Sequence, residues 1–414
     1  MGKKYWLLRR LANCGEGGYV KRIGRPLSSE RPRYPEKYSW WSPIIRKLVL
    51  KEDLSRDEVE EATFRILRLI ERGDESAPLL MASFFGGLTF KGPTVDELAA
   101  MYPGMERTRR VTLKFNLSKP VVTAGGTGGD TVKTINVTTP AVLLAASAGA
   151  VAVKSGARAF TSRTGATDLA MSMGINVYSS SRIVKNCVER LGTAVWASSI
   201  AYPWMEPLIE LRNREFAPIL FPQLDSLRLM IATSLNPFST KRQVRGVSTP
   251  QTRLVAEVLG KIGYERALVP LGYGVDESIR IDEFSNLGKT IVSELHQNGR
   301  IETYEVDCED LGVKRGDVNE VVSGETHRQN ALTILKVLSG RDRTGRRDLI
   351  AINAGAILYL ADEVDSIREG YELASNTIDE GYAIRKVGEL VKLSGGDSKR
   401  FSRMLRLIRP HNLR

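Results

Sequence analysis

A glycine-rich turn followed by hydroxyl side chains carries the most specific chemistry in this sequence. The turn reads Gly125-Gly126-Thr127-Gly128-Gly129-Asp130, and the run Asn136-Val137-Thr138-Thr139 follows it. Glycines let backbone N–H groups converge on an anion, and the N-terminus of a helix predicted over Pro140–Ala152 would add positive charge. Asp130 supplies an acceptor, and the two threonine hydroxyls supply donors or a metal ligand. The pattern predicts a pocket for a phosphorylated sugar.

The segments around this turn predict an α/β domain. A short β-branched strand, Pro120–Ala124, enters the turn, and Gly149–Val153 is predicted as the next strand. Strand, glycine turn and helix in this order are typical of phosphate binding in α/β domains. Ala267–Pro270 is a later strand, and Thr290–Leu295 with Ile301–Val306 predicts an antiparallel pair. We therefore expect a central mixed sheet.

Helical signals dominate the chain before this region. Ser55 with Glu58, and Thr94 with Glu97, each match a capping box at the start of a helix. Between them we expect a helix over Ala77–Phe85 that ends at Gly86-Gly87. These signals predict a small N-terminal helical domain beside a larger α/β domain, with the active site in the cleft between them. The predicted organisation is an extension over 1–41, the helical domain over 42–110 with part of 190–240 as a candidate addition, the α/β domain over 111–398 and a basic tail over 399–414.

Composition narrows the class of protein. The 414 residues include 42% hydrophobic and 26% charged residues, which predicts a globular chain. We find no apolar run of eighteen residues and no apolar core of a signal peptide at the N-terminus, and the three cysteines match no metal spacing, so we expect a cytoplasmic protein. The net charge is +12, and residues 1–40 hold ten Lys or Arg residues against three Glu. This extension would either bind nucleic acid or pack on its own protein or a partner subunit.

An ordered set of motifs resembles the anthranilate phosphoribosyltransferase family, which shares a fold superfamily with the pyrimidine nucleoside phosphorylases. The resemblance covers roughly residues 43–392. Besides the glycine turn and the Asn-Val-Thr-Thr run, its landmarks are Lys91-Gly92-Pro93-Thr94, Lys154–Arg158, Thr161-Ser162, Gly165–Leu169, Asn236-Pro237, Gln243, Gly246-Val247 and Asp282-Glu283.

The resemblance implies 5-phosphoribosyl diphosphate (PRPP) and Mg²⁺ as ligands, and a homodimer that pairs through the helical domain. It assigns PRPP binding to Gly126, Thr127, Gly128, Gly129, Asp130, Asn136, Thr138, Thr139, Lys154, Arg158 and Ser162. It assigns the metal to Thr138, Asp282 and Glu283, because carboxylate oxygens suit Mg²⁺. Asp276-Glu277 is a rival acidic pair just upstream. No catalytic side chain is assigned.

The acceptor site departs from the family pattern. Where the family has a His-Gly-Asn-Arg run after its lysine, this chain has Ser155-Gly156-Ala157-Arg158, and the family's later His-Pro is Tyr202-Pro203 here. Arg212 falls where the family keeps an arginine for the carboxylate of anthranilate. The predicted reaction is transfer of phosphoribosyl to an aromatic amine or related nucleophile, either anthranilate or another acceptor. The alternatives are a nucleoside phosphorylase-like enzyme and a non-catalytic nucleic-acid-binding relative.

Overall fold

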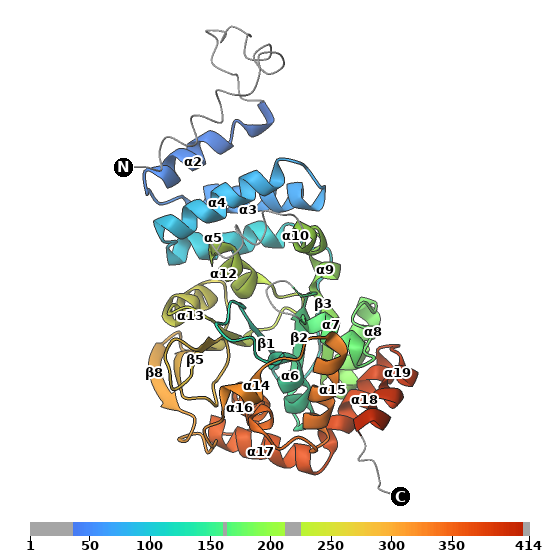
Figure 1. Cartoon of the computed structure of the whole chain (residues 1–414). Helices are drawn as coiled ribbons and strands as arrows, with labels where there is room; N and C mark the ends of the chain where they lie inside the picture. Colours follow the sequence, from blue (N-terminus) through green and yellow to red (C-terminus); the bar gives the residue numbers. More distant parts are fainter. Residues whose placement is uncertain (1–35, 160–163, 212–224, 409–414) are drawn as a thin grey trace, which may run out of the picture. The chain divides into compact units, whose positions relative to one another are not determined.

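The computed structural model describes residues 36–159, 164–211 and 225–408. The chain divides into two compact units, residues 1–43 and 44–414. In the first unit the described residues form the 3-10 helix η2 (Glu36–Tyr38) and the start of α2 (Trp41–Val49). The elements from α3 onward belong to the second unit (Figure 1). The finer boundaries expected at residues 41, 110 and 398 stay predictions.

The N-terminal part of the second unit is helical. It contains α3 (Arg56–Glu71), α4 (Ala77–Lys91) and α5 (Val95–Glu106). Both predicted capping boxes are confirmed, since Ser55 accepts from the N–H of Glu58 and Thr94 accepts from that of Glu97. The predicted end of the second helix at Gly86-Gly87 is wrong, because α4 continues to Lys91. At Gly87 a Cβ would lie 2.9 Å from the side chain of Leu48, so close packing explains the glycine.

One mixed sheet forms the centre of the α/β region, as the sequence predicts. Within the described residues it has eight strands in the order β3-β2-β1-β4-β5-β7-β8, with β6 paired to β5. The five strands β3, β2, β1, β4 and β5 pair in parallel, whereas β6, β7 and β8 are antiparallel to the strands beside them. The strands are β1 (Val121–Gly126), β2 (Val151–Gly156), β3 (Thr193–Ala197), β4 (Arg242–Gly246), β5 (Arg266–Tyr273), β6 (Arg280–Ile281), β7 (Lys289–Leu295) and β8 (Ile301–Asp307).

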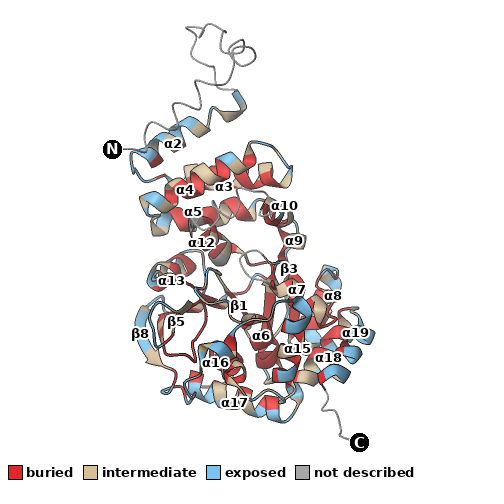
Figure 2. Ribbon diagram, viewed as in Figure 1, coloured by how far each residue is buried: buried red, intermediate tan, exposed pale blue. Residues whose placement is uncertain are grey.

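Helices cover both faces of this sheet. The chain leaves β1 through α6 (Thr138–Ser147) to reach β2, and leaves β4 through α13 (Thr252–Lys261) to reach β5, in opposite directions along the sheet. Because such crossovers are right-handed, α6 and α13 lie on opposite faces. Helix α6 packs against α16 (Gly345–Leu360), whereas α13 packs against α5. Buried residues fill these layers (Figure 2).

The remaining helices surround this core. They are α7 (Ala166–Ser172), α8 (Ser181–Leu191), α9 (Ser198–Ala201), α10 (Met205–Leu211), α12 (Asp225–Ser234), α14 (Val318–Val321), α15 (His327–Leu338), α17 (Ile367–Asp379), α18 (Tyr382–Leu393) and α19 (Ser398–Ile408). Helix α10 packs against α3, and α12 packs against α4 and α5. None of the described helices is long and apolar enough to cross a membrane.

The helix predicted over Pro140–Ala152 is shorter than expected. Helix α6 ends at Ser147, and the backbone at Gly149 has a φ of +114°, which ends the helical geometry before β2 begins at Val151. The apolar residues of α6 are followed almost at once by the apolar residues of β2, so hydrophobicity alone does not show where the helix ends and the strand begins.

Candidate functional site

The two opposite crossovers create a switch point between β1 and β4. In open α/β sheets ligands bind in the crevice at the carboxyl ends of the strands that flank such a point. A cavity of about 270 Å³ lies at this place. Its lining includes the glycine turn after β1, Lys154 from β2, Arg245 from β4 and the pair Asp282-Glu283. Side chains of α10 and α12 line it as well. The fold thus brings the predicted anion site and the predicted metal pair into one cavity.

The glycine turn has the backbone geometry that an anion site needs. Gly128 and Gly129 have φ values of +69° and +91°, which side-chain-bearing residues rarely adopt. The carbonyl of Gly128 accepts hydrogen bonds from Ser248 Oγ at 2.7 Å and from Arg228 Nη1 at 3.0 Å. The N–H of Thr127 donates to the carbonyl of Gly246 at 3.1 Å. Contacts from distant segments therefore hold the turn in place.

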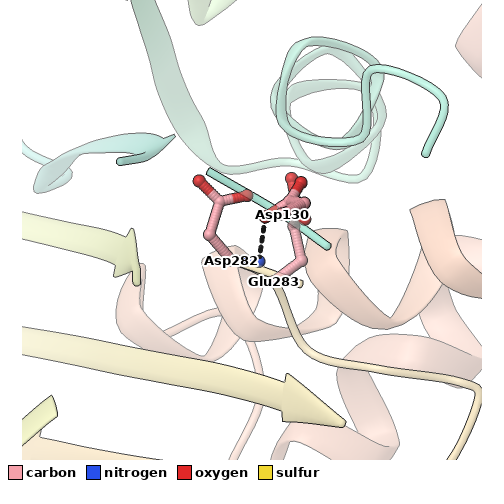
Figure 3. A group of neighbouring side chains, drawn as sticks. All are labelled: Asp130, Asp282 and Glu283. Atoms are coloured by element: carbon pink, nitrogen blue, oxygen red, sulfur yellow. Dashed lines mark hydrogen bonds between the residues drawn. The ribbon is translucent and has the colours of Figure 1, made fainter. Parts of the chain in front are cut away.

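Three carboxylates meet beside this turn. Ligand oxygens of Asp130, Asp282 and Glu283 all lie within 4.8 Å of one another (Figure 3). The backbone N–H of Asp282 donates to Asp130 Oδ1 at 2.9 Å, and Asp282 Oδ2 accepts from the N–H of Gly128 at 2.6 Å. Gly126 makes room for this arrangement, because a Cβ there would lie 1.9 Å from Asp282 Oδ2. The carboxylate group and the glycine turn are therefore one packed unit.

The electrostatics of the three carboxylates fit a divalent cation. Burial and the neighbouring Asp282 carboxylate raise the pKa of Asp130 and of Glu283 well above the usual range. Glu283 Oε2 is buried and has no hydrogen-bond partner among the described residues. A hard cation would relieve the repulsion and occupy the unpartnered oxygen, and carboxylate oxygens are the ligands that Mg²⁺ prefers. The donor set therefore fits Mg²⁺.

The rival acidic pair lies elsewhere. Asp276 and Glu277 follow β5 in an exposed loop, where Asp276 accepts from the N–H of Ser278 and Glu277 pairs with Lys289 at 2.9 Å. Neither belongs to the group of three carboxylates. The structure therefore brings Asp282-Glu283, and not Asp276-Glu277, to the glycine turn.

Two cations are buried in the same cavity. Lys154 Nζ donates to the carbonyl of Ala124 at 3.1 Å, and Arg245 donates through Nε and Nη2 to Gln243 Oε1. Burial and the nearby Arg245 lower the pKa of Lys154 to about 7, although Asp282 and Glu283 oppose this shift. Burial also lowers the pKa of Arg245. Both groups therefore gain from an anion in the cavity.

The predicted polar run at the start of α6 divides into cavity and core residues. Asn136 and Thr138 line the cavity. Asn136 Oδ1 accepts from the N–H of Thr139 at 3.2 Å, so it caps the helix as well. The side chain of Thr139 is buried and its hydroxyl has no described partner. Of the two threonines, Thr138 lines the cavity and Thr139 does not, and the role of Thr138 stays a prediction.

Of the remaining predicted residues, Arg158 belongs to the described part of the chain. Arg158 lines the cavity, and its guanidinium pairs with Glu206 at 2.7 Å, an interaction that raises the pKa of Arg158. Ser155 and Ala157 also line the cavity, as do aliphatic side chains of α10, of α12 and of Leu235, which directly follows α12. Those of the two helices are Met205, Leu208, Ile209, Leu227 and Ile231. Ser162 and Arg212 lie outside the described residues.

The structure adds polar cavity residues that the sequence did not single out. They are Lys133, Thr134, Thr164, Ser198, Arg228, Arg245, Ser323 and Asn330. Asn330 is buried and donates to Thr164 Oγ1 at 2.7 Å, so it supports the loop that precedes α7. Lys133, Thr134, Thr164 and Arg245 lie next to or between landmark residues, which was their signal in the sequence. The others come from segments that only the folded chain brings to the cavity.

Comparisons with known proteins agree with this geometry. The model of the glycosyl transferase family, a/b domain, matches residues 118–384. An anthranilate phosphoribosyltransferase of Methanococcoides burtonii is 32% identical over 354 residues, covering 85% of this chain and 94% of that protein. One from Rubrobacter xylanophilus is 34% identical over 351 residues, covering 84% and 96%.

Solved structures show the same fold. The structure of anthranilate phosphoribosyltransferase from Thermus thermophilus has a TM-score of 0.71 and 28% identity, and the match covers 85% of this chain and 99% of that one. The Saccharomyces cerevisiae enzyme, in complex with PRPP and Mg, has a TM-score of 0.71 at 22% identity, covering 86% and 97%. At that identity the second likeness concerns the fold alone. Together with the sequence matches, the fold and the site establish that this chain belongs to the anthranilate phosphoribosyltransferase family.

Proposed function

We propose that this chain is a magnesium-dependent phosphoribosyltransferase. It moves phosphoribosyl from PRPP to anthranilate or a related aromatic amine and releases diphosphate. The observation that carries the proposal is the packing of Asp130, Asp282 and Glu283 against the glycine turn in one cavity at the switch point of the sheet. Relatives that are 32–34% identical over nearly their whole length carry the same activity in their names.

Each part of the cavity has a role in this reaction. The N–H groups of Thr127 and Gly128 already donate to protein acceptors. We therefore assign the phosphate groups of PRPP to the N–H groups of Gly129 and Asp130 and to the N-terminus of α6, beside Asn136 and Thr138 in the cavity lining. Lys154 adds positive charge. Asp130, Asp282 and Glu283 would hold Mg²⁺, and Thr138, which lines the same cavity, is a candidate further ligand. When bound, Mg²⁺ neutralises charge on the departing diphosphate. No catalytic side chain is assigned, and in this proposal the chain's own residues act by positioning and by electrostatics.

The acceptor lies on the aliphatic side of the cavity. An aromatic ring can pack against Met205, Leu208 and Ile209 of α10, which gains apolar burial. Ser155 and Ala157 offer fewer directional hydrogen bonds than the family's histidine and asparagine. We therefore propose that this chain holds its acceptor more through packing than its relatives do. The role of Arg212 in binding a carboxylate stays a prediction.

Calorimetric titration with PRPP tests the proposal. We expect binding with Mg²⁺, much weaker binding with EDTA, and loss of anthranilate fluorescence when anthranilate is added to the ternary mixture. The double variant Asp282→Asn/Glu283→Gln should lose metal-dependent binding. The matched control, Asp276→Asn/Glu277→Gln, changes an equally acidic but exposed pair and should bind as the wild type does. No PRPP binding by the wild-type chain would refute the proposal.

We also propose a homodimer and a cytoplasmic location. Helix α4 exposes Leu79 and Phe90, with 69% and 75% of their surface accessible, on the helical part through which the family was expected to pair. The two described cysteines, Cys187 and Cys308, are buried free thiols, as is usual in a reducing compartment. Light scattering at several protein concentrations measures the mass directly. A monomer at all concentrations would refute the dimer.

A further inference from the structure

We propose that Arg245 is a substrate-binding residue that holds an oxygen of the diphosphate group of PRPP, together with Lys154. The inference rests on the proposed function and deepens it, because it adds a second buried cation to the anion-binding part of the cavity. Arg245 lies on β4, which pairs with β1 on the side away from β2. No role was predicted for Arg245 from the sequence.

Arg245 is buried and forms no direct ion pair with a described residue. Its residue surface is 8% accessible, and it lines the cavity. Its described hydrogen bonds go to the neutral Gln243 Oε1, at 3.2 Å from Nε and 3.0 Å from Nη2. Within the described residues no carboxylate lies within ion-pair distance of its guanidinium. Asp282 lies near enough to attract the guanidinium, but a buried guanidinium without a direct ion pair is still costly, and a bound anion would offset that cost.

The position of Nη1 points to the glycine turn. A Cβ built on Gly125, the first residue of the turn, would lie 2.3 Å from Arg245 Nη1 and 3.1 Å from Lys154 Nζ. The two cationic groups therefore lie close to the same point, and Gly125 is the residue whose missing side chain accommodates both. Like charges at this separation repel, and an anion between or above them removes the repulsion. The lowered pKa of Lys154 agrees with this arrangement.

The diphosphate is the anion that this place favours. Arg245 lies against Gly125, and Asp282 of the carboxylate group lies against the next residue, Gly126. The guanidinium and the proposed metal ligands therefore contact adjacent residues of the turn. A diphosphate held by Mg²⁺ at those carboxylates would reach Nη1 with a second oxygen. Guanidinium groups bind phosphate oxygens strongly, and the interaction grows as negative charge develops on the leaving diphosphate. The aliphatic wall that we assign to the acceptor comes from α10 and α12 instead.

The test measures binding of inorganic diphosphate and PRPP, each with Mg²⁺, to purified wild-type and variant chains by calorimetry. In Arg245→Met, which keeps the length of the side chain without its charge, both dissociation constants should rise about tenfold or more, because a charge-assisted hydrogen bond is lost. Arg245→Lys should recover part of the affinity, since it restores the charge but not the planar group. The KM for anthranilate should stay within about twofold in both variants.

The matched control is Arg242→Met on the same strand. Arg242 is also mostly buried, yet it pairs with Asp362 and the carbonyl of Leu360 and does not line the cavity. The Arg242→Met variant should lower thermal stability without changing the affinity for diphosphate. If Arg245→Met does not fold, Arg245→Lys and Arg245→Gln decide by the same titration.

Three results would overturn the inference. Wild-type affinity for diphosphate in a folded Arg245→Met chain shows that Arg245 holds no diphosphate. A raised KM for anthranilate with unchanged diphosphate affinity assigns Arg245 to the acceptor. Absence of diphosphate and PRPP binding by the wild-type chain refutes the proposed function together with the inference, whereas the first two results leave the proposed function intact.

Discussion

The carboxylate of Asp282 accepts a hydrogen bond at 2.6 Å from the backbone N–H of Gly128, a residue 154 positions earlier in the chain. Gly128 belongs to the turn that we assign to phosphate binding, and Asp282 belongs to the group that we assign to the metal. One contact therefore joins both sites. A change at either residue should disturb the other, so metal and phosphate binding are expected to be coupled.

The first prediction concerns Asp282→Asn. The amide oxygen can still accept from Gly128, so the turn keeps its support, but one negative charge is lost from the metal site. We expect kcat/KM to fall by about a hundredfold or more, with little change in thermal stability. Steady-state assays at several Mg²⁺ concentrations measure this loss. Wild-type activity with a wild-type dependence on Mg²⁺ concentration would contradict a direct ligand role, and Asp276→Asn is the control.

The second prediction concerns Gly126→Ala. The added methyl would meet Asp282 Oδ2 at 1.9 Å, so either the turn or the carboxylate must move. We expect loss of both Mg²⁺ and PRPP binding, measured by calorimetry. Gly260→Ala is the matched control, because its methyl would meet only the flexible side chain of Leu295, at 3.3 Å, and should leave binding intact. Unchanged PRPP affinity in Gly126→Ala would show that the turn is not part of the site.

The third prediction concerns the acceptor. The double change Ser155→His/Ala157→Asn restores the family's residues beside the cavity. If anthranilate is the acceptor and the lost hydrogen bonds limit its binding, the KM for anthranilate should fall by about fivefold or more. Fluorescence assays of anthranilate consumption at saturating PRPP measure it. A KM that does not change would mean that these two positions do not limit the use of anthranilate.

The fourth prediction concerns stability and pH at Glu106. Burial raises the pKa of Glu106, even though it accepts from Tyr202 at 2.7 Å and pairs with Arg109 at 2.7 Å. A carboxyl whose pKa is higher in the folded than in the unfolded chain contributes most stability at low pH and loses it as pH rises through the folded pKa. Relative to Glu106→Gln, the wild-type free energy of unfolding should therefore fall as the pH rises above the ordinary carboxyl pKa of 4.5.

Urea unfolding at a series of pH values measures this difference. Glu325→Gln, at an exposed position, is the control and should track the wild-type chain at every pH. A free-energy difference between wild type and Glu106→Gln that does not depend on pH would contradict the expected titration.

Much of this protein could be inferred from the sequence because the decisive signals are local. The glycine turn needs positive φ at Gly128 and Gly129, the capping boxes at Ser55 and Thr94 need side chains three residues apart, and strand pairs need β-branched runs. Such features depend on neighbours in the chain, and they sufficed for the mixed sheet, the helical region and the family. The end of α4 was missed because Gly87 serves a contact with Leu48 that no local pattern shows.

The tertiary structure decided which residues meet. The sequence left Asp276-Glu277 as a rival to the predicted metal pair Asp282-Glu283. Only Asp282-Glu283 lies with Asp130, because it follows the short strand β6 that pairs with β5. Arg245 and Asn330 belong to the cavity for the same reason. Local sequence determines the conformation of a turn or a helix end, whereas the formation of a site depends on strand order and crossovers that bring distant segments to one edge of the sheet.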